Sequence, residues 1–101
     1  MARVELAPEV LDDLDRFVTH METSGAGDVG QRIDDLIAAI QVLEHSPHMG
    51  RPVRGGKREL VIGRGPRGYV ALYRYVAPIE TVFILAIRAQ REALFKRRGS
   101  R

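Results

Sequence analysis

The sequence predicts a small α+β domain in which a hairpin of two helices packs on one face of a mainly antiparallel sheet. In the first half of the chain, apolar residues recur with the 3.6-residue period of amphipathic helices. The second half changes to short runs rich in Val, Ile, Tyr and Phe, separated by Gly and Pro. A chain of 101 residues fits one domain, so residues 1–101 are expected to form a single core. The expected order is β-α-α-β-β-β with a short C-terminal helix.

The first half of the chain predicts one strand and two helices. Arg3–Leu6 is the expected strand. From Pro8 to about Met21, and from about Asp28 to Ser46, apolar residues follow one face of a helix. A short Gly-containing segment separates the two helices, which are therefore expected to lie antiparallel. Three early acidic residues are expected to complement the positive end of the first helix dipole: Glu9, Asp12 and Asp13.

The second half predicts three consecutive antiparallel strands at Arg58–Ile62, Tyr69–Val76 and Thr81–Arg88. Gln90–Lys96 is expected to form the short final helix, and the basic tail Arg97–Arg101 is expected to fray.

The middle one of these strands separates aromatic from aliphatic side chains. Successive strand residues point to opposite faces, and the helical hairpin is expected to cover the face that carries the tyrosines. The other face then presents aliphatic residues around one arginine, which is either a partner site or a surface that neighbouring strands and loops bury. The expected core face carries Tyr69, Ala71, Tyr73 and Tyr75, and the other carries Val70, Leu72, Arg74 and Val76.

Composition excludes several classes of function. The chain has no cysteine, which excludes disulfides, thiolate zinc sites and cysteine nucleophiles. No apolar run approaches the roughly 20 residues that cross a bilayer, so a cytoplasmic protein without a membrane partner is expected. His20, His45 and His48 lack metal-ligand spacing and are expected at the surface, and no metal is expected. Gly63–Gly68 matches G-x-G-x-x-G but precedes a strand, so no dinucleotide cofactor is expected.

The charge is strongly polarised along the chain. Residues 1–46 hold three of the 16 basic and ten of the 13 acidic residues, a net charge of −7. Residues 47–101 hold the other 13 basic residues and three acids, a net charge of +10. A cationic half of this kind attracts polyanions or acidic protein partners.

The order of motifs in this basic half resembles the RelE/ParE superfamily of type II toxin–antitoxin toxins. The similarity extends over about 90 residues and includes the two-helix insertion after the first strand. Its motifs are P-x-x-G-R-P-V at Pro47–Val53, R-E-L at Arg58–Leu60, G-Y-x-x-x-Y-R-Y at Gly68–Tyr75, and the apolar strand that ends at Arg88 before Q-R-E.

The resemblance implies one of two activities. RelE-like members cleave ribosome-bound mRNA with basic residues on the strands and a C-terminal tyrosine or histidine, whereas ParE-like members poison DNA gyrase. In this chain Leu60, Val70 and Phe95 occupy positions where the RNase branch has functional polar residues. Phenylalanine has no proton to transfer, and arginine is a poor general acid or base. An endoribonuclease would have to rely on Arg58, Arg88 and Arg91.

The resemblance therefore favours a ParE-like gyrase inhibitor with no catalytic residues, no cofactor and no small-molecule substrate. Two alternatives stay open: a ribosome-dependent mRNA interferase and a non-toxic nucleic-acid-binding module. The residues expected to bind the target are Arg88, Arg91, Lys96, Arg97 and Arg98. The residues expected to bind a cognate antitoxin are Arg51, Arg54, Val70, Leu72, Arg74 and Arg88.

Overall fold

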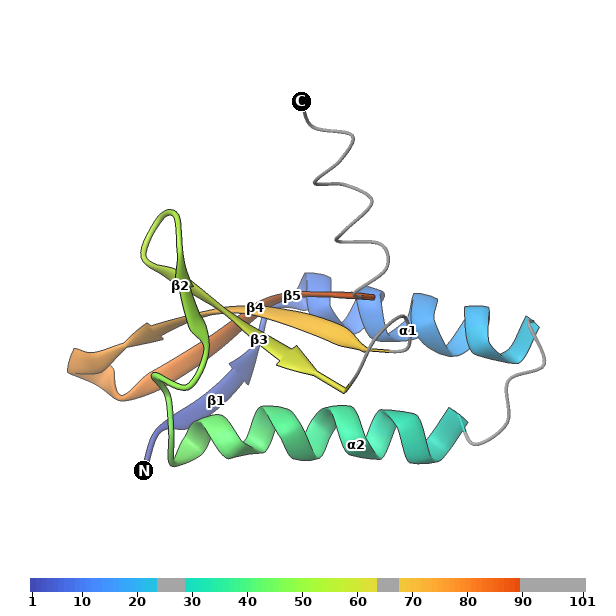
Figure 1. Ribbon diagram of the computed structural model, residues 1–101, viewed down its shortest axis with the longest axis horizontal. Helices are drawn as coiled ribbons and strands as arrows, with labels where there is room; N and C mark the ends of the chain where they lie inside the picture. Colours follow the sequence, from blue (N-terminus) through green and yellow to red (C-terminus); the bar gives the residue numbers. More distant parts are fainter. Residues whose placement is uncertain (24–28, 64–67, 90–101) are drawn as a thin grey trace.

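The computed structural model describes residues 1–23, 29–63 and 68–89 and confirms the α+β architecture. Two helices pack on a five-stranded, mostly antiparallel sheet (Figure 1). The turn between the helices, the expected final helix at Gln90–Lys96 and the basic tail lie outside the described residues. The elements are β1 Arg3–Leu6, α1 Pro8–Thr23, α2 Val29–Gln41, η1 Val42–Glu44, β2 Arg51–Val53, β3 Lys57–Ile62, β4 Tyr69–Val76, η3 Ala77–Ile79 and β5 Thr81–Ala89.

The sheet places the first strand of the chain beside the last one. Its strand order is β1-β5-β4-β3-β2, with β1 parallel to β5 and every other pair antiparallel. The first strand therefore lies beside the last one, and β1 and β2 form the two edges. Because β1 ends at Leu6, opposite Ile84, the second half of β5 extends beyond its parallel neighbour.

The two helices run in opposite directions and bury one face of each against the sheet (Figure 1). Val10 and Phe17 of α1 and Leu36 and Ile40 of α2 are buried in the main core. The second helix is shorter than expected, because the α-helix ends at Gln41 and the chain tightens into the 3₁₀ turn η1. Pro47 follows, and a proline disfavours helical backbone at the residue before it, which here is Ser46.

The tyrosine face of β4 is the core face, as expected. Ala71 and Tyr73 are fully buried, and Tyr69 and Tyr75 pack against the same core. The opposite face is only partly covered. Val70 is buried, Leu72 and Val76 are half-buried, and Arg74 is exposed. The β2–β3 hairpin projects from the side of the sheet away from α2 (Figure 1).

Two features of the sheet were not predicted. The first is β2, three residues that pair antiparallel with β3. Its Pro52 has no N–H to donate, and it is tolerated because β2 is an edge strand. The second is an irregularity in β5, where Leu72 pairs with Ala86 but Tyr73 pairs with Ile84. The extra residue in β5 is a β-bulge, which allows Ile84 and Ile87 both to face the core.

Among the described helices, none is long and apolar enough to cross a membrane.

Candidate functional site

A loop between η1 and β2 is tied to the core by the hydroxyl of Tyr73. This hydroxyl accepts a hydrogen bond from the backbone N–H of Gly50 at 2.8 Å and donates one to the carbonyl of Pro47 at 2.8 Å. Gly50 is required at this point. A Cβ there would lie 2.6 Å from Cε1 of Tyr73 and 2.8 Å from the carbonyl oxygen of Glu59. The motif Pro47–Val53 therefore encodes a tightly packed loop.

Arg58 holds the same loop from β3. Its Nη1 donates to the carbonyl oxygens of Gly50 at 2.8 Å and His48 at 3.2 Å. Arg58 pairs with Tyr73 across the sheet, so the two side chains reach the loop from neighbouring strands. The ring of His48 in turn contacts Tyr75 edge-on, with 5.2 Å between the ring centroids. Arg58, the residue that an endoribonuclease would need on this strand, thus orders backbone carbonyls in this fold.

A second cluster joins α1 to the end of β5. Asp13 is only 5% exposed, and its Oδ2 accepts a hydrogen bond from the backbone N–H of Ile87 at 3.0 Å. Its Oδ1 accepts one from Nη1 of Arg88 at 2.9 Å, and Nη1 of Arg16 lies 3.4 Å away from the same oxygen. Nη1 of Arg88 also donates to the carbonyl of Ile87 at 3.2 Å. Asp13 was expected to complement the dipole of α1, but its position puts it in contact with β5 instead.

This cluster lies along the part of the β5 edge that β1 does not cover. Beyond Ile84, β5 has no β1 residue beside it, and unpaired backbone groups at a sheet edge are costly to bury and prone to pairing with other chains. The Asp13 carboxylate satisfies the N–H of Ile87 and the Arg88 guanidinium satisfies its carbonyl. The Asp13–Arg88 pair therefore satisfies both backbone groups of Ile87 on the part of the β5 edge that β1 does not cover.

The residues expected to bind an antitoxin lie on the outer face of the sheet, the face opposite the core face, or in the turn between β2 and β3. Cross-strand pairing places Arg51 opposite Glu59 and Glu59 opposite Leu72. The Arg51 guanidinium forms an ion pair with Glu59 at 2.8 Å. Val70 lies opposite Arg88, and Arg74 donates from its Nη2 to the carbonyl of Gly55 at 2.8 Å. The exposed Arg54 lies in the turn between β2 and β3.

Arg88 is the one described member of the set expected to bind the target, and 34% of its side chain is exposed. The other four members lie outside the described residues: Arg91, Lys96, Arg97 and Arg98. His20, His45 and His48 are exposed, as expected. Within the described ranges, no three His, Cys, Asp or Glu side chains come together in a way that would hold a metal ion.

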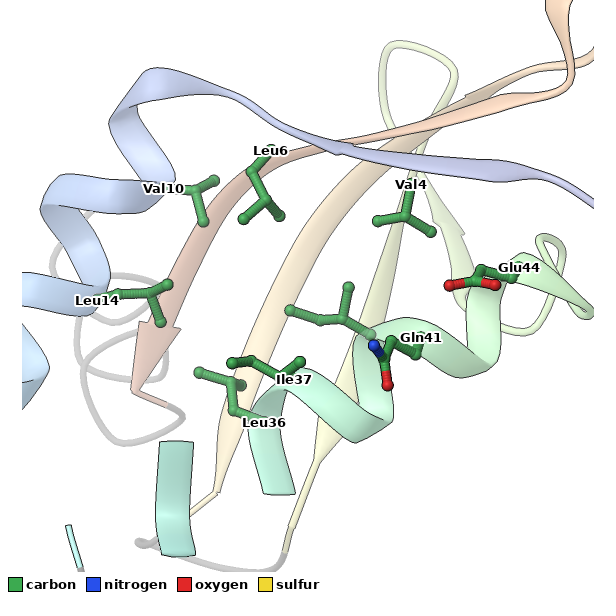
Figure 2. A pocket seen from close by; sticks show the side chains of 9 residues that line it. Val4, Leu6, Val10, Leu14, Leu36, Ile37, Gln41 and Glu44 are labelled. Carbon is green, nitrogen blue, oxygen red and sulfur yellow. The ribbon is translucent and has the colours of Figure 1, made fainter. Parts of the chain in front are cut away.

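Sequence reasoning missed an apolar groove between β1 and the two helices. The hollow has a volume of about 250 Å³, and Figure 2 shows aliphatic side chains from all three elements pointing into it, with Gln41 and Glu44 at its α2 side. Leu6 is 43% exposed and Ile37 is 42% exposed, which is high for large aliphatic side chains. A signal was present in α2, because Ile37 directly follows the buried Leu36 and widens the apolar face of the helix. The lining residues are Val4, Leu6, Val10, Leu14, Leu36, Ile37, Ile40, Gln41 and Glu44.

The fold places the chain in the class of small α+β proteins that have two antiparallel helices on a five-stranded sheet. A solved structure described as the chromosomal ParDE toxin–antitoxin system from P. aeruginosa has the same fold, with a TM-score of 0.73 and 22% sequence identity over 88% of this chain and 96% of that chain. No curated protein gives a significant match. The model of the ParE toxin family of the type II toxin–antitoxin system parDE matches residues 4–94, so the chain belongs to that toxin family.

Proposed function

We propose that this ParE-family toxin acts in the cytoplasm by binding DNA gyrase, without breaking bonds itself. One observation carries the proposal: positions where RNA-cleaving relatives are expected to have functional polar residues are apolar and buried in this chain. Leu60 and Val70 are each only 9% exposed. Arg58 remains, but its Nη1 is bonded to loop carbonyls. Phosphodiester cleavage needs groups that move protons, and a guanidinium does this poorly.

The contact surface that we propose begins at the end of β5. Arg88 is fixed there and partly exposed, and the chain continues from Ala89 into a segment rich in basic residues. A concentrated positive charge suits either an acidic protein surface or the phosphates of the DNA that gyrase holds. The proposed target-binding residues are Arg88, Arg91, Lys96, Arg97 and Arg98.

Two assays run side by side test this function. Purified toxin is added to a gyrase supercoiling reaction, and separately to a translating extract whose mRNA is examined by primer extension. We expect inhibited supercoiling and no new transcript ends. We expect the double variant Arg97→Glu/Arg98→Glu to inhibit less, while Arg58→Lys, which keeps the charge on β3, still inhibits. Transcript cleavage that is lost in Arg58→Ala would establish the mRNA interferase alternative instead.

We also propose that a cognate antitoxin neutralises the toxin by wrapping two surfaces. Its acidic residues would meet the arginines of the outer face, Arg51, Arg54, Arg74 and Arg88, beside the aliphatic side chains of Val70 and Leu72. Its apolar residues would enter the groove, whose exposed aliphatic side chains support this contact. A partly disordered chain can cover both regions, and a large interface is needed to offset a folding cost of roughly 2 to 5 kcal/mol.

Paired variants separate the two surfaces. Leu72→Asp places a charge on the outer face, Ile37→Asp places one in the groove, and Arg101→Ala is the control. Binding of the antitoxin encoded beside the toxin is measured by calorimetry. We expect both aspartate variants to weaken binding at least tenfold more than the control does. If Leu72→Asp binds as well as Arg101→Ala, the outer face is not part of the interface.

A further inference from the structure

We propose that Asp13 of α1 is a positioning residue for the target-binding surface: it holds Arg88 and the end of β5 in the arrangement that the target contacts. The inference rests on the proposed function in one respect, because that function assigns Arg88 to target binding. Asp13 itself is 5% exposed and cannot be a principal contact. Its effect on the target must therefore pass through the residues that it holds.

The geometry fits a carboxylate and no neutral substitute. All the groups bonded to Asp13 are donors: the N–H of Ile87 at 3.0 Å, Arg88 at 2.9 Å and Arg16 at 3.4 Å. A carboxylate accepts through both oxygens, whereas an asparagine amide must turn its own NH₂ group toward one of these donors. We call these contacts of Asp13 the clamp. The Asp13→Asn variant keeps the size of the side chain and loses the acceptor on one side of the clamp.

Arg88 gains a fixed position from this clamp while it remains at the surface. Its Nη1 bonds to Oδ1 of Asp13 and to the carbonyl of Ile87, and 34% of the side chain stays exposed. An arginine that is already ordered loses less conformational freedom when it binds a partner than a solvated one does. The clamp also fixes the backbone of β5 two residues before Ala89, the last described residue, after which the sequence is rich in basic residues.

A double-mutant cycle tests whether Asp13 acts through Arg88. The variants are Asp13→Asn, Arg88→Gln and the two combined, with Asp15→Asn as the control because it removes the same charge from an exposed position on the same helix. Growth arrest after expression and inhibition of gyrase supercoiling are both measured, with thermal unfolding to compare folded fractions.

We expect Asp13→Asn and Arg88→Gln each to raise the half-inhibitory concentration about tenfold, and the double variant to be no weaker than Arg88→Gln alone. Such non-additivity follows if one residue works through the other. Independent losses that multiply in the double variant, or Asp13→Asn with the potency of Asp15→Asn, would overturn the inference. A toxin that arrests growth but leaves gyrase active would refute the proposed target, and the same cycle would then be judged on growth arrest alone.

A measurement on the unaltered toxin does not depend on any variant folding. Rotation of arginine guanidinium groups is followed by nitrogen-resolved NMR, with Arg54, exposed in the β2–β3 turn, as the reference. We expect slow rotation and separate Nη signals for Arg88 and averaged signals for Arg54. Averaged signals for both residues would show that Asp13 does not hold Arg88, and the inference would fail.

Discussion

Arg58 on β3 and Arg88 on β5 are both half-buried arginines, but they donate hydrogen bonds to different kinds of acceptor. Arg58 donates to two neutral carbonyls of one loop, those of His48 and Gly50. Arg88 donates to the carboxylate of Asp13, supplied by a helix 75 positions away in the sequence, and to the carbonyl of its own neighbour. The Arg58 contacts, which we call the Arg58 corner, order the loop between η1 and β2. The contacts among Asp13, Ile87 and Arg88, the Arg88 corner, satisfy the backbone groups of Ile87 at the edge of β5. The partner, more than the residue type, distinguishes Arg58, which orders a loop, from Arg88, which we propose as a target contact.

The largest effect is expected at the Arg58 corner, from Gly50→Ala. The new Cβ would lie within 3 Å of the Tyr73 side chain and of the backbone oxygen of Glu59, and backbone cannot give way cheaply. We expect a loss of about 3 kcal/mol in the free energy of unfolding, measured by urea denaturation. Gly30→Ala in α2 is the control, since no atom of the described residues, apart from its chain neighbours and its own helix backbone, lies within 4 Å of the added Cβ. An equally mild effect of both variants would show that the loop is loosely packed.

At the Arg88 corner, Asp13→Ala is expected to cost roughly 2 to 3 kcal/mol, because it leaves the N–H of Ile87 buried without its acceptor and Arg88 without its carboxylate. Urea denaturation gives the loss, and hydrogen exchange at the Ile87 amide localises it. The exposed Asp15→Ala should change stability by less than about 0.5 kcal/mol. An Ile87 amide that stays as protected as in the wild type would contradict the role given to this carboxylate.

Tyr73→Phe is expected to have a smaller effect, about 1 to 2 kcal/mol. The ring stays in the core, but the N–H of Gly50 and the carbonyl of Pro47 lose their shared partner. Differential scanning calorimetry would report the lower melting temperature. Tyr75→Phe is the matched control, because that half-buried ring lies on the same face of β4. Toxicity should survive in both variants, since neither ring belongs to the proposed target surface. Loss of growth arrest in a folded Tyr73→Phe variant would give the loop a direct functional role.

Periodicity predicted what depends on local pattern. Alternation along Tyr69–Val76 placed the tyrosines toward the core, and the 3.6-residue stripes placed both helices on that face. It missed β2, because three residues that include Pro52 carry too little pattern to define a strand. It missed the bulge in β5, because an added residue is visible only against the partner strand.

The site was less predictable than the fold, because its contacts join residues far apart in the sequence. Asp13 shows what was missed: it lies three residues after Val10 and four before Phe17, inside the apolar stripe of α1. A single carboxylate on the buried face of a helix needs donors, and this is a sequence signal. The identity of those donors, in β5, required the fold.

The smallest effect is expected at a third arginine, and it sharpens the comparison between the other two. Arg51 pairs with Glu59 at 2.8 Å, as close as any contact of Arg58 or Arg88, but 65% of its side chain is exposed. Water already solvates the Arg51 guanidinium, although only 20% of the Glu59 side chain is exposed, so Arg51→Ala should cost about 1 kcal/mol or less, and less still at high salt. Urea denaturation at two salt concentrations measures this. A salt-independent loss above about 1.5 kcal/mol in the free energy of unfolding would contradict this expectation. It would mean that the short distance alone sets the strength of these arginine contacts, and that the burial of Asp13 does not make the Arg88 contact different.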